Sequence, residues 1–274
     1  MKTSWRRLGA AAALILAAVA TAPAVVLAGA RPVDPALVVP LEKIAPEHRE
    51  GVAEVIRDAS FHRQGAPDTF PCNPKLYLAL LNEPALTLAL WQDLSDSPAR
   101  LKQVAPGRYE GTDGSGTTAT WEFVYRSPRL NVMLCDLEHV TPRGNGRIAG
   151  RVVLVIRSGF YRESNGEPWV QHNVEAFVKV DSRGWKALAK TVRPLIEKVL
   201  EDQVQEAGWF VSLMGRLVVT YPDWATEVGM KQTQLPLEVR ANFRQVVQQS
   251  RKADASTGRP QMVDNSADSG TRRR

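Results

Sequence analysis

The sequence predicts an α+β protein in which an antiparallel β-meander is followed by one long α-helix. Residues 108–180 contain runs of period-two alternation separated by short turn sequences, which is typical of antiparallel strands. Residues 184–219 carry apolar side chains at helical spacing, with charged side chains at the other positions. Two short helices are predicted over residues 73–94, ahead of the meander.

The region before the meander divides into an extended lead-in, a short helix, a strand and the helix pair. Residues 31–45 contain three prolines and are predicted to be extended. Residues 47–60 have the apolar spacing of a short amphipathic helix, whereas one glycine and two prolines exclude a helix from residues 61–72. The helix pair begins at Asn73, a favourable N-cap followed by proline, and is divided at Pro84.

Five strands and the long helix make up the rest of the predicted domain. The sequence Asp113-Gly114-Ser115-Gly116 is a strong hairpin turn between the first two strands. Asp181 and Ser182 cap the helix over residues 184–219, which at ~1.5 Å per residue is long enough to cross a whole sheet. The strands are predicted over residues 108–112, 117–126, 130–139, 148–156 and 169–180, and a further amphipathic helix over residues 236–250.

The first thirty residues have the pattern of a secretory signal peptide. A positively charged start and the uncharged, apolar residues 8–27 precede the small-residue cleavage pattern of Ala28–Ala30. Cleavage after Ala30 leaves a mature chain that begins at Arg31 and is exported, to the periplasm or the exterior. The alternative is an uncleaved membrane anchor, because the apolar run is just long enough to cross a bilayer. The basic residues of the start are Lys2, Arg6 and Arg7.

Charge is distributed unevenly along the 274-residue chain. The net charge is +6, but three basic residues belong to the signal peptide, and six basic and three acidic residues belong to the tail after residue 250. The remaining body has 26 basic and 26 acidic residues, so no nucleic-acid partner is expected. The predicted regions are a signal peptide (1–30), an N-terminal extension with a short helix (31–58), the main domain (59–222), a helical extension (223–250) and a disordered basic tail (251–274).

The cysteines and histidines indicate no metal site. Cys72 and Cys135 leave two states open, one disulfide in an oxidising compartment or two separate buried thiols. No cysteine or histidine pair has the spacing of a zinc site, and no dinucleotide-binding or phosphate-binding loop occurs, so we expect neither a metal nor a cofactor. The four histidines are His48, His62, His139 and His172.

A family resemblance follows from the order of the elements. The positions that carry it are Thr69–Pro74 running into Tyr77, Leu80 and Leu81, then Pro84 and Trp91, and finally Asp181 followed by the helix from Trp185 to Val219. Over about residues 60–222 the chain resembles the START/polyketide-cyclase-like superfamily, which has the helix-grip fold. The resemblance implies a curved antiparallel sheet packed on a long C-terminal α-helix, with a cavity between them for a lipid or another hydrophobic small molecule. The broken first strand, the N-terminal helix and the C-terminal extension depart from the minimal fold.

Candidate ligand-binding residues lie on two strands and on the long helix. His172 shares the apolar face of its strand with valines, where it either lines a polar pocket or is a core histidine bonded to a backbone carbonyl. An aromatic stripe on another strand, and residues late in the long helix where the resemblance places the cavity mouth, are either pocket lining or plain core. These further candidates are Trp121, Phe123, Tyr125, Trp209 and Met214.

No catalytic residue is assigned from the sequence. The Gly114–Gly116 turn lacks the strand-to-helix elbow of a hydrolase nucleophile. Asp136 and Glu138 share a strand face and are expected to be solvated, with Arg157 as a neighbouring cation for either of them.

Three functions remain open on these grounds. The first is an exported protein that holds a hydrophobic small molecule or lipid in an internal cavity, with or without peripheral contact to a membrane. The second is a cyclase-like or hydrolase-like enzyme, which requires His172 to converge with a carboxylate or a tyrosine. The third is a structural or interaction protein of the cell envelope with a filled interior. The oligomeric state is left open.

Overall fold

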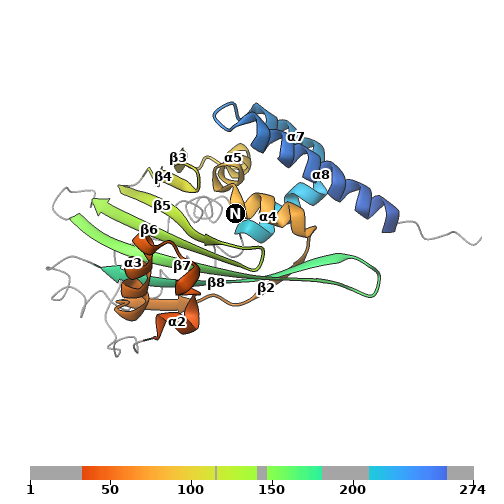
Figure 1. The fold of residues 1–274 in the computed structure, drawn as a ribbon. Coiled ribbons are helices and arrows are strands. Elements are labelled where there is room, and N and C mark those ends of the chain that lie inside the picture. Colours follow the sequence, from red (N-terminus) through yellow and green to blue (C-terminus); the bar gives the residue numbers. More distant parts are fainter. Residues whose placement is uncertain (1–32, 115, 141–146, 181–209, 258–274) are drawn as a thin grey trace, which may run out of the picture.

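The computed structural model describes residues 33–114, 116–140, 147–180 and 210–257, and its centre is one curved, eight-stranded antiparallel sheet (Figure 1). The strand order is β1-β8-β7-β6-β5-β4-β3, with β2 also paired to β8, so the first strands lie beside the last. The predicted α+β class, with a curved antiparallel sheet and C-terminal helices, is confirmed. The strands are β1 Phe61–Gln64, β2 Asp68–Pro71, β3 Arg100–Ala105, β4 Arg108–Thr112, β5 Thr117–Arg126, β6 Leu130–Val140, β7 Arg147–Arg162 and β8 Pro168–Val180.

The first predicted strand is divided into two short halves on the same neighbour. β1 and β2 both pair with β8, and between them the Gly65 N–H donates to the Val174 carbonyl at 2.8 Å. Glycine and proline therefore interrupt the ladder locally without removing the segment from the sheet.

Helices cover both faces of the sheet. On the inner face lie α4, α5 and the helical residues 210–220, with α7 and α8 packed against α5 and α4 (Figure 1). On the outer face lie the three short N-terminal helices. The helices are α2 Pro35–Val38, η1 Leu41–Lys43, α3 Pro46–Arg57, α4 Pro74–Asn82, α5 Pro84–Leu94, α7 Pro222–Lys231 and α8 Leu237–Thr257.

Two separate hydrophobic cores result from this arrangement. The inner core includes Phe70, Tyr77 and Trp91, and the outer core includes Ile56 and Phe177. The central strands β7 and β8 contribute side chains to both cores. Since a strand buried on both faces needs apolar residues at every position, this explains the uninterrupted apolar run that the sequence shows over residues 152–156.

Several boundaries differ from those that the sequence predicted. The edge strand β3 was not predicted, because most of its side chains are exposed and it lacks a buried apolar stripe. The helix α7 was not predicted as a separate helix within the helical extension (223–250), since only Ala225, Val228 and Gly229 of its ten residues are buried. β7 continues six residues past the predicted end at Ile156, and α8 continues to Thr257.

The C-terminal part of the predicted long helix is described from residue 210. Residues 210–220 are helical, and Phe210, Met214 and Val218 at helical spacing belong to the inner core. The predicted signal peptide, residues 181–209 with Trp209, and residues 258–274 lie outside the described part. Within the described ranges, no helix combines the length and the apolarity needed to cross a membrane.

Both cysteines are buried free thiols. Cys72 lies at the β2–α4 junction, where it packs against Gly215: a Cβ at that glycine would be 3.4 Å from the Cys72 sulfur and 3.2 Å from the Phe70 ring. Burial raises the pKa of Cys135 far above its usual range, and the charge of Asp136 raises it further. The structure therefore contains two separate buried thiols, which is the second of the two states that the sequence left open.

Candidate functional site

The candidate site is a cavity of about 100 Å³ between the inner face of the sheet and the helices that cover it. From the sheet it is lined mainly by Trp121, Phe123, Met133, Leu154 and Ile156. From α4, α5 and the helix after residue 210 it is lined mainly by Leu80, Leu81, Thr87, Phe210 and Val211. The wall is therefore apolar almost throughout.

Three side chains bring polar groups to this wall. Thr87 uses its hydroxyl, which donates to the Leu80 carbonyl at 2.6 Å. The indole nitrogen of Trp121 is buried and has no hydrogen-bond partner among the described residues. His172 from β8 is the third, and it is 2% exposed. Because it both donates and accepts, the imidazole is the most versatile polar group at the cavity.

Aromatic side chains fix the position of His172. Its ring centroid lies 5.5 Å from that of Phe70, edge to face, and 5.7 Å from that of Tyr77. Tyr77 comes from α4, which begins where the Asn73 side chain accepts the Lys75 N–H at 2.9 Å. Because this cap fixes the residue at which α4 begins, it also fixes how far the Tyr77 side chain extends into the core.

A second polar contact lies next to the imidazole. The Tyr77 hydroxyl and the Ser158 hydroxyl are 2.6 Å apart in the buried interior. Burial raises the pKa of Tyr77 well above its usual range, and this outweighs the lowering by the Ser158 hydrogen bond, so Tyr77 stays a neutral phenol.

Strand register places three polar side chains in one row on the inner face. Ser158 of β7 is paired directly with His172 of β8, and Asp68 of β2 is paired with the same His172. Directly paired residues of antiparallel strands point to the same face, with Cβ atoms ~4.5–5.5 Å apart. At the outer end of the row, the Asp68 carboxylate lies 3.7 Å from the guanidinium of Arg216.

The structure brings some of the predicted site residues together and separates others. His172, Trp121 and Phe123 line the cavity. Met214 is fully buried in the inner core but does not line the cavity. Tyr125 was predicted on the same face as Phe123, and this is wrong: a β-bulge between them turns Tyr125 toward the outer core.

The predicted ion pair of Arg157 with Asp136 or Glu138 is also wrong. The register sets Leu130 opposite Arg157, six residues away from Asp136 on β6. Arg157 instead bonds Glu175 at 2.6 Å.

The Ser158–Tyr77 pair was missed from the sequence. The predicted end of β7 at Ile156 stopped two residues before Ser158, so its pairing with His172 was not considered.

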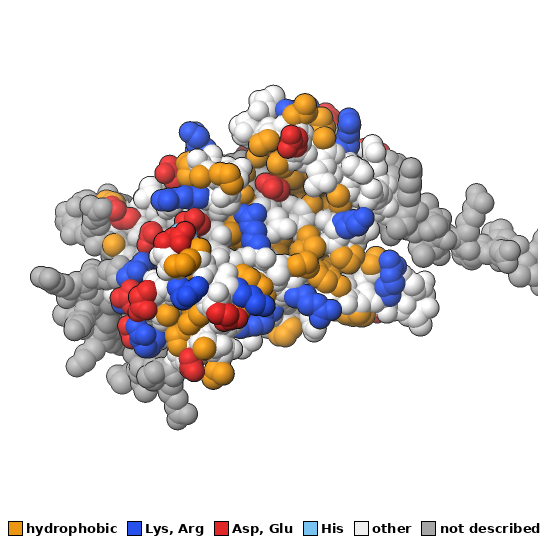
Figure 2. Space-filling model, in the orientation of Figure 1, with side chains coloured by type: hydrophobic (Ala, Val, Ile, Leu, Met, Phe, Trp, Pro, Cys, Tyr) orange, Lys and Arg blue, Asp and Glu red, His pale blue; other side chains and the backbone are white. Residues whose placement is uncertain are grey.

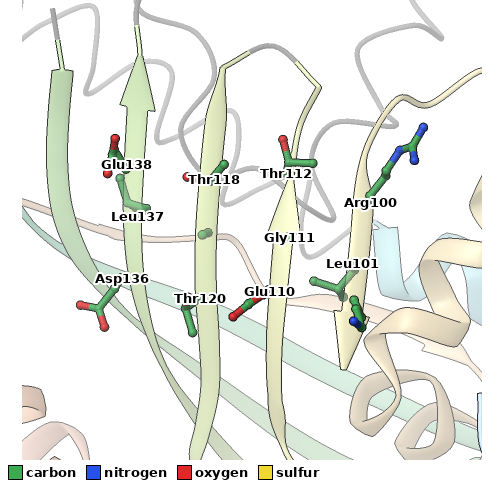
Figure 3. Close-up of a pocket in the computed structure, with 12 residues that line it drawn as sticks. Arg100, Leu101, Glu110, Gly111, Thr112, Thr118, Thr120, Asp136, Leu137 and Glu138 are labelled. Atoms are coloured by element: carbon green, nitrogen blue, oxygen red, sulfur yellow. The ribbon is translucent and has the colours of Figure 1, made fainter. Parts of the chain in front are cut away.

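An open groove of about 610 Å³ lies over strands β3–β6 (Figure 3). Glu110, Asp136 and Glu138 line it together with Arg100 and Lys102. Acidic and basic side chains are likewise interspersed on the side of the molecule drawn in Figure 2. Among the described residues no group of three or more histidine, cysteine or carboxylate side chains is placed to hold a metal ion.

Comparisons with known proteins find similar solved structures but no family. No family model matches the chain, and neither does any curated protein. A conserved protein from Geobacillus kaustophilus is 14% identical (TM-score 0.35; 57% of this chain, 97% of that chain). A hypothetical protein from Helicobacter pylori is 11% identical (TM-score 0.37; 58% and 89%). The di-domain ARO/CYC BexL from the BE-7585A biosynthetic pathway is 15% identical (TM-score 0.33; 62% and 56%). At these identities and TM-scores, no function is transferred to this chain.

Proposed function

We propose that this protein is exported and binds a small hydrophobic molecule in the cavity between its sheet and its inner helices. The observation that carries the proposal is the cavity wall, which is apolar except for Thr87, Trp121 and His172. Burial of apolar ligand surface supplies the affinity, at ~25 cal/mol per Å², while the imidazole orients the ligand. The order of the elements supports a place in the START/polyketide-cyclase-like superfamily.

The volume favours a small molecule over a whole lipid. An engineered apolar cavity of about 150 Å³ in another protein holds one benzene molecule. A cavity of about 100 Å³ therefore suits a ligand with a handful of heavy atoms. A full acyl chain requires the helices over the cavity to move apart.

A pair of matched variants tests binding. Val211 lines the cavity, whereas Val219, which is on the same helix and also partly buried, does not. We expect native mass spectrometry and thermal shift to detect binding of benzene or toluene to the unmodified chain and to V219F, and no binding to V211F. Absence of binding to the unmodified chain at millimolar ligand contradicts the proposal.

Export rests on the sequence of the first thirty residues. Cell fractionation, with intact-mass measurement of the purified protein, is expected to show a chain that begins at Arg31 outside the cytoplasm. A full-length chain in the membrane fraction supports the uncleaved anchor instead, and a full-length chain in the cytoplasm contradicts export.

A further inference from the structure

We propose that Phe123 and Arg126 form a movable cover over the mouth of the cavity and set the rate at which ligand enters and leaves. This inference rests on the proposed function, because it concerns exchange of the ligand that the cavity binds. Phe123 lines the cavity from β5, and the central carbon of the Arg126 guanidinium lies 3.7 Å from the centroid of the Phe123 ring. The cation therefore lies over a ring that is itself part of the cavity wall.

The exposure of the lining residues locates the mouth of the cavity. Pro84, Phe123 and Val211 are partly exposed, whereas the other residues that line the cavity are buried. These three come from the start of α5, from β5 and from the helix after residue 210. A ligand that enters without separating the sheet from its helices therefore passes between them, and Phe123 is the largest of the three side chains.

Groups from several elements surround the guanidinium. Gly107, in the β3–β4 turn, leaves room for it, since a Cβ there would lie 3.3 Å from Arg126 Nη2. Burial raises the pKa of both Glu83 and Tyr109, the charge of Glu83 raises the pKa of Tyr109 further, and the nearby Arg126 charge opposes the rise at each. Glu83 directly precedes Pro84, so Arg126 links the junction of α4 and α5 to strands β4 and β5 beside the mouth.

The cover can move without disruption of the core. Arg126 is the last residue of β5 and is exposed, and the ladder between β5 and β6 is interrupted by the bulge that follows Phe123. An exposed cation–π contact changes an equilibrium constant by only about 2- to 5-fold, so the guanidinium leaves the ring readily. Rotation of the Phe123 side chain then opens the wall between Pro84 and Val211.

The test is the rate of fluorobenzene exchange, measured by ¹⁹F NMR on the whole chain as the cell produces it. R126A removes the cation and should raise the association and dissociation rate constants together by about 2- to 5-fold, with Kd unchanged. E83Q keeps the size of the side chain but removes its charge, and it should raise both constants by a smaller factor. The control is R100A, which removes an exposed arginine that lines the open groove and not the cavity, and it should change neither constant.

The outcomes separate this inference from the binding function. If fluorobenzene binds but exchanges from R126A and E83Q at the rate measured for R100A, the cover is refuted and binding stands. If R126A raises only the dissociation rate constant and weakens affinity, Arg126 holds the ligand itself, which also overturns the inference. If R126A does not fold, the comparison of E83Q with R100A decides. If the unmodified chain binds neither fluorobenzene nor toluene, the binding function fails by its own test and the inference fails with it.

Discussion

Arg157 on β7 and Glu175 on β8 form an ion pair on the outer face of the sheet. The distance between Arg157 Nη1 and Glu175 Oε2 is 2.6 Å. Nη2 of Arg157 donates to the Val38 carbonyl at 2.8 Å, and Nε2 of His62 lies 2.8 Å from the other carboxylate oxygen. The pair therefore joins the N-terminal segment to the two central strands, away from the cavity.

This carboxylate should make stability depend on pH. Burial alone raises the pKa of Glu175, but the hydrogen bonds of His62 and Arg157 outweigh it, so the net pKa lies below the ordinary value. A group with a lowered folded-state pKa stabilises the protein above its unfolded pKa of about 4.3 and loses this contribution as the pH falls through the folded pKa. We expect E175Q to cost about 1–2 kcal/mol at neutral pH and to flatten the acid side of the profile.

Urea denaturation between about pH 3 and pH 7 measures this profile. The control is E110Q, which removes an exposed carboxylate on β4. Parallel pH profiles for E175Q and the unmodified chain would show that Glu175 is not the source of the pH dependence.

The Tyr77–Ser158 hydrogen bond predicts non-additive mutations. Y77F leaves the buried Ser158 hydroxyl without this partner, and S158A does the same to the phenol, so each should lower the free energy of unfolding by about 1–3 kcal/mol. The double variant removes both polar groups together and should cost less than the sum of the single changes. A double-mutant cycle by chemical denaturation measures the coupling, and additivity within error would refute the contact.

The hairpin between β4 and β5 should depend on Gly116. Its φ is 109°, and a Cβ there would lie 2.5 Å from the Val140 carbonyl oxygen. Gly166, in the β7–β8 turn, has a φ of 83° and no atom within 4 Å of such a Cβ.

The two glycines form a matched pair, because an alanine at either position adopts an unfavourable positive φ. Only G116A adds the backbone clash, so it should lower the free energy of unfolding by about 1–3 kcal/mol more than G166A. Equal losses in thermal or urea unfolding would show that the two turns do not differ in this way.

Cysteine reactivity checks the thiol state. Because Cys72 and Cys135 are buried thiols, and burial raises the pKa of Cys135, neither should react quickly with a colorimetric thiol reagent in the native protein. Two thiols should react after denaturation without a reductant. If none reacts under those conditions, the chain contains a disulfide instead.

The sequence was most informative where structure depends on neighbours along the chain. Asn73 and Pro74 predicted the start of α4, and the Asp113–Gly116 turn predicted both flanking strands to the residue at that end. Capping and positive-φ turns act over a few residues, so their signals stand in the local sequence. The buried face of β8 was likewise readable from its alternation, which placed His172 inside.

What only the tertiary structure decided involves pairing between distant segments. Ser158 meets Tyr77 across 81 positions, and Asp68 meets His172 through the register of β2 on β8. The bulge that removed Tyr125 from the cavity side depends on how β5 aligns with β6. Alternation along one strand shows which residues share a face, but the residue opposite each of them depends on the whole sheet and its covering helices. The sequence alone therefore determined most of the elements and the buried imidazole, and the fold determined the strand β3, the helix α7 and which groups surround the imidazole.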